Sequence, residues 1–245
     1  MKYVKTFRVL INDTDCNGVA KASTVMKYYQ QIAHEQLQQV GPDSETLKKS
    51  GCGFVLSRVS LSIYLPLFAD DEITAETWPC ESRGTSFIRC GRIMRGEDIV
   101  SEIYTVWGLV GMYDKKLRTV DEYPVGAPPE PALTLDIPTR LRLPKNMELM
   151  LAGERKIVYS DVDTNMHMNN AHYPDMFCDF VPSHGGKNRL VSNRPVAVLI
   201  NYFSEAPLGE TLKIYSGEED GNYFFKTIRE NGTVGAEAEI ILDEI

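Results

Sequence analysis

Two copies of one short polar pattern lie far apart in this chain, and they constrain its fold more than any other feature. Asp13-Thr14-Asp15-Cys16-Asn17 lies 148 positions before Asp161-Val162-Asp163-Thr164-Asn165, each time between a strand pattern and a helix pattern. A second match has an offset of 138: Tyr64-Leu65 and Glu72 against Tyr202-Phe203 and Glu210. Such self-similarity indicates a duplicated structural unit.

The first copy reads as a helix followed by a sheet. Apolar residues recur at helical spacing over 23–40, and Gly41-Pro42 supplies the stop. Four segments rich in β-branched and aromatic residues follow this helix. They predict strands over 54–68, 72–80, 86–95 and 99–112.

A proline-rich stretch then interrupts regular structure, as a linker between domains would. Beyond it the plan repeats, with a strand over 155–159, a helix over 170–181 and strands beginning near 195, 210, 223 and 234. Asn231-Gly232 predicts a hairpin turn. We therefore predict a first repeat over 1–125, a linker over 126–150 and a second repeat over 151–245.

The composition restricts the class of protein. With 43% apolar and 24% charged residues the chain is typical of a globular protein. It has no secretory signal pattern and no run of about 18 apolar residues, so we expect a cytoplasmic protein without a membrane span. A net charge of −8 argues against nucleic-acid binding. Five scattered cysteines and the absence of phosphate-binding glycine motifs predict no disulfide framework, no metal and no cofactor.

The two repeats differ at positions that can carry chemistry. The first offset sets Val19 of the first repeat against His167 of the second. The second offset sets Leu67 against Glu205, so the histidine and the carboxylate both belong to the second repeat. A fused pair resembles a twofold dimer within one chain, and such a chain can lose one of its two equivalent sites. We expect one active and one degenerate repeat.

The spacing of Asp163, Asn165 and His167 suggests a polar cluster. In an extended stretch, residues two apart point the same way. Histidine is the residue type suited to proton transfer near neutral pH, asparagine both donates and accepts hydrogen bonds, and the aspartate can orient either neighbour. Glu205, from a distant strand, is a candidate general base for water. The alternative is that these side chains only cap the following helix, but the missing histidine in the first repeat favours function.

A resemblance to a known family rests on several strings. Asp163-Thr164-Asn165-Met166-His167-Met168-Asn169-Asn170 is similar to the D-x-N-x-H-x-N-N signature of the acyl-acyl-carrier-protein thioesterases of plants and bacteria. Trp107, the turn Lys115-Lys116-Leu117-Arg118 and the string Asn201-Tyr202-Phe203-Ser204-Glu205 add support. The resemblance covers nearly the full chain.

The resemblance implies an α+β fold, the double hotdog, in which two long helices are each wrapped by an antiparallel sheet. It implies hydrolysis of fatty acyl thioesters in fatty acid synthesis, with catalytic residues at Asp163, Asn165, His167 and Glu205. In plant members a cysteine follows the glutamate, whereas this chain has Ala206. A cysteine mechanism through that position is therefore impossible here.

The same resemblance implies the substrate contacts. It places the acyl chain in the first repeat, against residues such as Val55, Leu56 and Val59, and it adds Asn169 and Asn170 of the signature as substrate-binding residues. The implied partner is an acyl carrier protein. Because carrier proteins are acidic, an acidic enzyme must gather positive charge locally. The candidates lie in two basic runs: Arg83, Arg89, Arg92 and Arg95, or Lys187, Arg189 and Arg194.

Three alternatives stay open from the sequence. Hotdog proteins also include thioesterases for acyl-coenzyme A and dehydratases for hydroxyacyl chains, and the fold alone does not separate them. A non-catalytic acyl-binding module is the third, although such a module has no need for His167 and Glu205 in one repeat. The chain can be a monomer or a homodimer.

Overall fold

The first repeat consists of a long helix and an antiparallel sheet. In this computed structural model the structure describes residues 1–123, 125–183 and 189–245. The elements of the first repeat are β1 (Tyr3–Arg8), α1 (Ala22–Val40), α2 (Ser44–Ser50), β2 (Cys52–Ile63), β3 (Glu72–Pro79), β4 (Phe87–Arg95), β5 (Asp98–Gly111) and β6 (Leu117–Arg118). The predicted helix and four strands are confirmed to within a few residues at most ends, and α2 is an addition.

The second repeat has the same order of elements with a shorter helix. Its elements are β7 (Met150–Lys156), α3 (Tyr173–Asp179), β8 (Asn193–Tyr202), β9 (Thr211–Glu219), β10 (Asn222–Ile228) and β11 (Val234–Glu244). The long helix predicted over 170–181 is instead a 3₁₀ turn, Asn170–His172, followed by the seven residues of α3. Pro174 stands in the first turn of α3, where its missing N–H costs no helical hydrogen bond.

The strands of both repeats join into one 11-stranded sheet. Its order is β1-β3-β4-β5-β2-β8-β11-β10-β9-β7, and β6 pairs with β5. β2 and β8 meet antiparallel at the centre, with Val59 opposite Ile200 and Leu61 opposite Val198. The two halves of this order are equivalent strand by strand, so the sheet has the pseudo-twofold arrangement that a duplicated unit produces.

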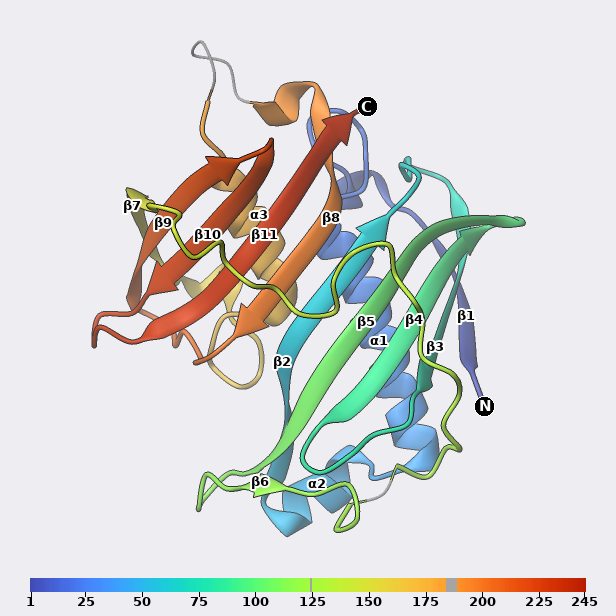
Figure 1. Cartoon of the computed structure of the whole chain (residues 1–245). Helices are drawn as coiled ribbons and strands as arrows, with labels where there is room; N and C mark the ends of the chain where they lie inside the picture. The colour runs from blue at the N-terminus through green and yellow to red at the C-terminus, as the bar shows by residue number, and fades with distance from the viewer. Residues whose placement is uncertain (124, 184–188) are drawn as a thin grey trace.

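Both helices lie on one face of this sheet, and they share a core. Figure 1 shows α1 behind the strands of the first repeat and α3 behind those of the second. One continuous cluster of buried apolar side chains includes Ile32 of α1, Phe177 of α3 and Ile200 of β8. The hydroxyl of Ser23 also donates to the carboxylate of Asp175 at 2.6 Å. None of the helices in the described ranges is both long enough and apolar enough to cross a bilayer.

The segment predicted as a linker packs on the opposite face of the sheet. We call residues 126–149, all of which the structure describes, the strap; they form neither helix nor strand. Ser60 donates to the carbonyl of Pro138 at 2.8 Å, and Asn201 donates to that of Leu141 at 3.2 Å. Figure 1 shows the yellow-green strap crossing in front of the sheet from one repeat to the other. The strap is thus a layer of the fold.

Candidate active site

The residues Asp163 to His167 form a tight turn between β7 and α3. The amide of Met166 donates to the carbonyl of Asp163 at 3.0 Å, and the amide of Asp163 donates to the carbonyl of His167 at 3.2 Å. Met166 has a φ of +64°, in the left-handed region. The extended conformation predicted for this stretch is therefore wrong. Asp163, Asn165 and His167 are neighbours because a turn brings them together, not because they alternate along a strand.

The first repeat contains the same turn. Asp15 accepts from the amide of Asn17 at 2.8 Å, as Asp163 does from the amide of Asn165. Gly18 has a φ of +74° at the position of Met166. Since the repeat without the histidine keeps the aspartate and its hydrogen bond, this aspartate builds the turn in both repeats. It orients its neighbours by fixing the backbone.

His167 and Glu205 face one another across two adjacent loops. Nε2 of His167 lies 3.7 Å from Oε1 of Glu205. His167 is bridged to Pro207, and the amide of Met168 donates to the carbonyl of Ala206 at 2.8 Å, so the backbone holds the two loops together. Glu205 keeps 60% of its side-chain surface exposed, against 19% for His167. The pair thus combines a sheltered imidazole with a carboxylate that solvent can reach.

The backbone corrects the alignment between the repeats near Glu205. Two hydrogen bonds, each 2.8 Å, are equivalent: Ala20 N to Leu67 O, and Met168 N to Ala206 O. Leu67 therefore matches Ala206, and the offset is 139 instead of 138. The first-repeat residue that matches Glu205 is then Pro66. The difference in chemistry remains, since the first repeat has Val19 and a proline in place of the histidine and the carboxylate.

The two asparagines that follow the histidine have structural contacts. Asn169 caps the 3₁₀ turn by accepting from the amide of Ala171 at 2.8 Å. The carbonyl of Asn170 accepts from the hydroxyl of Tyr202 at 2.9 Å. Tyr202 packs edge-on against Tyr173, with ring centroids 5.2 Å apart, and burial raises the pKa of both phenols. These tyrosines stay protonated, and the hydroxyl of Tyr202 holds the backbone at Asn170. The sequence did not predict this packing role.

Within the described residues, neither the position after Glu205 nor Cys178 of α3 supplies a thiol nucleophile for this pair. Ala206 is 1% exposed at the position after Glu205. Burial, together with Asp175 and Asp179, raises the pKa of the Cys178 thiol well above its usual value, so this thiol stays protonated. Among the residues that the structure describes, no three His, Cys, Asp or Glu side chains lie close enough together to hold a metal ion.

A narrow cavity lies between α1 and the sheet of the first repeat. Its lining residues come from α1 and from strands β2 to β5: Met26, Tyr29, Gln30, Ala33, Leu56, Val59, Thr77, Arg89, Cys90, Ile103, Thr105 and Trp107. Leu56 and Val59 were predicted as acyl contacts, and they line it. Val55 does not, because it faces the other side of β2, toward Gly108. The free volume is about 20 Å³, so an acyl chain requires side chains such as Met26 to move.

Arg89, on β4, is one of the residues that line this cavity. Its Nη1 donates to Oε1 of Gln36 at 2.6 Å and to the hydroxyl of Thr77 at 3.2 Å. In the part of the chain that the structure describes, no carboxylate pairs with it. Burial lowers the pKa of its guanidinium to about 10, and the group remains charged at neutral pH. The lining therefore combines mostly apolar side chains with one buried cation.

The basic runs proposed from the sequence are mostly engaged within the protein. Arg92 pairs with Glu102 at 2.6 Å, and Arg95 pairs with Asp71 at 2.7 Å. Arg194 donates to two backbone carbonyls. Arg83 forms a longer ion pair with Glu81 at 3.3 Å, and Arg189 forms one with Glu218 at 3.8 Å. Lys187 lies outside the described residues. Among their described members, neither run presents a set of free cations.

Comparisons with known proteins agree with this architecture. The crystal structure of an acyl-ACP thioesterase from Bacteroides thetaiotaomicron superposes with a TM-score of 0.85 at 16% sequence identity, covering 99% of this chain and 98% of that one. The 12:0-ACP thioesterase from Umbellularia californica superposes with a TM-score of 0.84 at 14% identity, covering 100% of this chain and 98% of that one. In sequence, the acyl-CoA thioester hydrolase YbgC of Escherichia coli is 28% identical over 91 residues, which are 37% of this chain and 68% of that protein. Both solved thioesterase structures therefore have the same fold as this chain.

Family models cover both repeats. The model for the acyl-ACP thioesterase N-terminal domain matches residues 1–124, and that for the C-terminal domain matches residues 146–244. Together they take in the turn at 163–167 and Glu205, which carry the candidate chemistry. This chain belongs to the acyl-ACP thioesterase family, and its double hotdog fold is the fold of that family's solved structures.

Proposed function

We propose that this protein hydrolyses fatty acyl thioesters of the acyl carrier protein and releases the free fatty acid. The observation that carries the proposal is the 3.7 Å approach of His167 to Glu205, in the second repeat only, in a chain of the acyl-ACP thioesterase family. We place the reaction at this pair. The cytoplasmic location stays a prediction, and so does an oligomeric state of monomer or homodimer.

In the mechanism that this geometry supports, Glu205 is the general base. Its carboxylate takes a proton from a water molecule as the water oxygen attacks the thioester carbonyl carbon. His167 holds Glu205 and the water in line, and the 3.7 Å gap closes through a small side-chain movement or a bridging water. Negative charge develops on the carbonyl oxygen. When the intermediate collapses, the C–S bond breaks and the proton passes to the leaving thiolate.

Asn165 is the proposed oxyanion donor. Its backbone N–H is occupied by Asp163 at 2.8 Å, so the donor is its side-chain amide, which is solvent-exposed on the turn. A backbone N–H near the start of the following 3₁₀ turn is the second donor. Asp163 acts only by holding the turn. Hydrogen bonds to a developing oxyanion strengthen as charge accumulates, which is the difference that catalysis requires.

The repeats divide the work in this proposal. The first repeat, 1–125, holds the acyl chain between α1 and its sheet, with Leu56 and Val59 on the wall. The segment 126–150 ties the repeats together across the outer face, and the second repeat, 151–245, supplies the catalytic residues. Asn169 shapes the site through its side-chain oxygen, which accepts from the amide of Ala171, and Asn170 through its backbone carbonyl, which accepts from Tyr202; neither contact requires the substrate.

Thiol release from acyl-carrier-protein thioesters tests the proposal. The wild type should release free thiol, whereas His167→Ala and Glu205→Ala should each lose it while keeping the far-UV circular dichroism of the wild type. Release that persists in both variants would place the chemistry elsewhere. Elimination of water from hydroxyacyl substrates without thiol release would identify a dehydratase, and acyl binding without either reaction would identify a binding module.

Acyl-coenzyme A is the second candidate substrate. The 91-residue match to the Escherichia coli acyl-CoA thioester hydrolase favours testing it. Both thioesters carry the same phosphopantetheine thiol, so the site around His167 cannot separate them. The discriminating quantity is the ratio of kcat/KM for one acyl chain on the two carriers, and we expect the carrier protein to be preferred.

A further inference from the structure

Three cations on the strap have a setting unlike the other basic residues proposed for docking. Arg140, Arg142 and Lys145 are exposed, and between positions 137 and 147 the chain has no acidic residue. Within the described ranges 1–123, 125–183 and 189–245, none of the three forms an ion pair. In a protein with a net charge of −8 this is a local reversal of sign.

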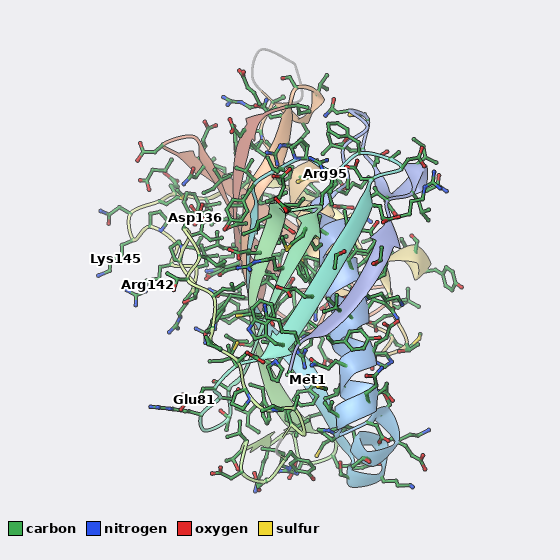
Figure 2. All side chains as sticks on the ribbon, turned by 90° about the vertical axis from the view of Figure 1, so that its right-hand side faces the viewer. Met1, Glu81, Arg95, Asp136, Arg142 and Lys145 are labelled. Carbon is green, nitrogen blue, oxygen red and sulfur yellow. The ribbon has the colours of Figure 1, made fainter. Side chains whose placement is uncertain are left out.

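The strap holds these cations on a fixed base. Leu141 is 3% exposed, and with Leu143 it packs against Leu199 and Phe224 on the outer face of the sheet. The apolar side chains point inward while the charged ones point out. Figure 2 shows Arg142 and Lys145 projecting away from the ribbon, on the side opposite α1. Fixing the backbone beforehand reduces the entropy that binding a partner would cost.

The strap that carries these cations contacts β8 near the end that leads to Glu205. Leu141, between Arg140 and Arg142, accepts from Asn201 at 3.2 Å. Glu205 follows Asn201 by four residues, a stretch that spans at most about 14 Å. A phosphopantetheine arm is an extended flexible chain that can cross such a distance. Figure 1 shows the strap passing in front of β8 near the end from which the Glu205 loop continues.

Arg58 adds a fourth cation beside this set. It is the register partner of Asn201 where β2 pairs with β8. Ser60, two residues farther along the same strand, contacts the strap, so Arg58 lies on the strap's side of the sheet. Its side chain is half-buried and forms no ion pair within the described part of the chain.

We propose that Arg140, Arg142 and Lys145 form the docking surface for the acidic acyl carrier protein, which delivers its phosphopantetheine arm around the end of β8 to Glu205. This inference rests on the proposed function. Two acidic proteins repel one another at long range, so association requires a local positive field that orients the partner. The exposed rim position of these charges means that they act mainly on association and on KM.

A triple charge reversal tests the surface. Arg140→Glu, Arg142→Glu and Lys145→Glu are combined in one variant and assayed with one acyl chain on two thiols, the carrier protein and N-acetylcysteamine. We expect kcat/KM for the carrier-protein thioester to fall on the order of ten-fold or more, through KM. Hydrolysis of the small thioester should be unchanged, because the substituted residues do not touch the reacting atoms.

A matched control makes the same change in net charge elsewhere. Lys48→Glu, Lys115→Glu and Lys116→Glu alter exposed residues in α2 and in the turn before β6. This variant should keep wild-type kcat/KM for both thioesters. The wild-type KM for the carrier protein should also rise with ionic strength, and that dependence should weaken in the strap variant alone.

The outcomes separate the two proposals. If both triple variants lose carrier-protein activity equally, or neither does, the strap is not the docking surface, although hydrolysis by His167 and Glu205 stands. If the wild type hydrolyses the small thioester but has no preference for the carrier protein, the proposed partner is wrong and the docking surface falls with it. If it hydrolyses neither thioester, the proposed function itself fails.

Discussion

Asn165 and Asn17 occupy the same position in the two repeats, but their side chains have different surroundings. Asn17 donates from Nδ2 to the carbonyl of Leu190 at 2.7 Å, a contact between the repeats. Asn165 is exposed beside His167. The first repeat thus uses its asparagine to hold the structure together, whereas the exposed amide of Asn165 is free for the substrate contact that we propose.

This difference predicts opposite effects of one substitution. Asn165→Ala should lower kcat by about 100 to 1,000-fold, the usual effect of losing an oxyanion donor, with an unchanged midpoint of thermal unfolding. Asn17→Ala should leave kcat near the wild-type value and lower the free energy of unfolding by about 1 kcal/mol, since it removes a hydrogen bond. Steady-state kinetics and thermal unfolding of both variants check this; comparable kcat values in the two variants would contradict it.

Arg89 predicts a limit on acyl chain length. Strands β2 and β4, which carry Leu56 and Arg89, are two inter-strand spacings apart, about 10 Å, which corresponds to an alkyl chain on the order of eight carbons. An apolar chain end that reaches a charged guanidinium must desolvate it, which is unfavourable. Arg89→Met should therefore shift the kcat/KM profile toward longer chains, and Arg89→Lys should shift it less. A profile that is identical in Arg89→Met and the wild type would exclude this role.

At the level of elements, the turn before each helix relies on a left-handed residue. Gly18 has a φ of +74°, and a Cβ there would meet no atom within 4 Å, so any cost of a side chain is conformational. Met166 takes the same conformation in the second repeat without glycine. A non-glycine residue in this region costs roughly 1 kcal/mol, and at Met166 that strain lies beside His167 of the candidate site.

Gly18→Ala should accordingly lower the free energy of unfolding by about 1 kcal/mol. The matched variant Met166→Ala should change it by less than about 0.5 kcal/mol, because the residue is already a non-glycine and is 58% exposed. Urea denaturation of both variants measures the difference. Equal destabilisation in the two variants would contradict the prediction, because the cost at Gly18 would then not come from its left-handed conformation.

For the molecule as a whole, the continuous sheet and shared core predict cooperative unfolding. Trp78 and Trp107 both lie in the first repeat, so tryptophan fluorescence reports that repeat alone. Phe177 of the second repeat is fully buried, and its ring stacks on Phe225 at 5.1 Å. It belongs to the same apolar cluster as α1. A change at Phe177 must therefore be felt in both repeats if they unfold as one unit.

Phe177→Leu should lower stability by on the order of 1–2 kcal/mol and should shift the fluorescence midpoint and the far-UV circular dichroism midpoint by the same amount. A fluorescence midpoint that stays at the wild-type value while the circular dichroism transition splits would mean that the repeats unfold separately. Wild-type curves recorded with both probes serve as the reference.

Local patterns in the sequence were sufficient for much of this architecture. The duplication, the long helix α1 and most strands follow from periodicity and turn residues, which act over a few neighbours along the chain. The asymmetry between His167 and Val19 is visible in the same way. The family resemblance implied Val55, Leu56 and Val59 together as acyl contacts, and only Leu56 and Val59 line the cavity, because the bulge in β2 after Leu56 changes which residues face α1.

Other features depend on contacts between distant segments, which no local pattern encodes. The one-residue correction of the offset comes from hydrogen bonds between loops about 40 residues apart, and the 3.7 Å approach of His167 to Glu205 comes from the same pairing. The proline-rich segment read as a linker because it lacks periodicity, yet its alternate apolar residues pack on the sheet as a strap. The sequence thus determined the units and their chemical groups, whereas tertiary packing decided the register, the catalytic distance and the position of the strap's cations, because only the folded chain brings those segments together.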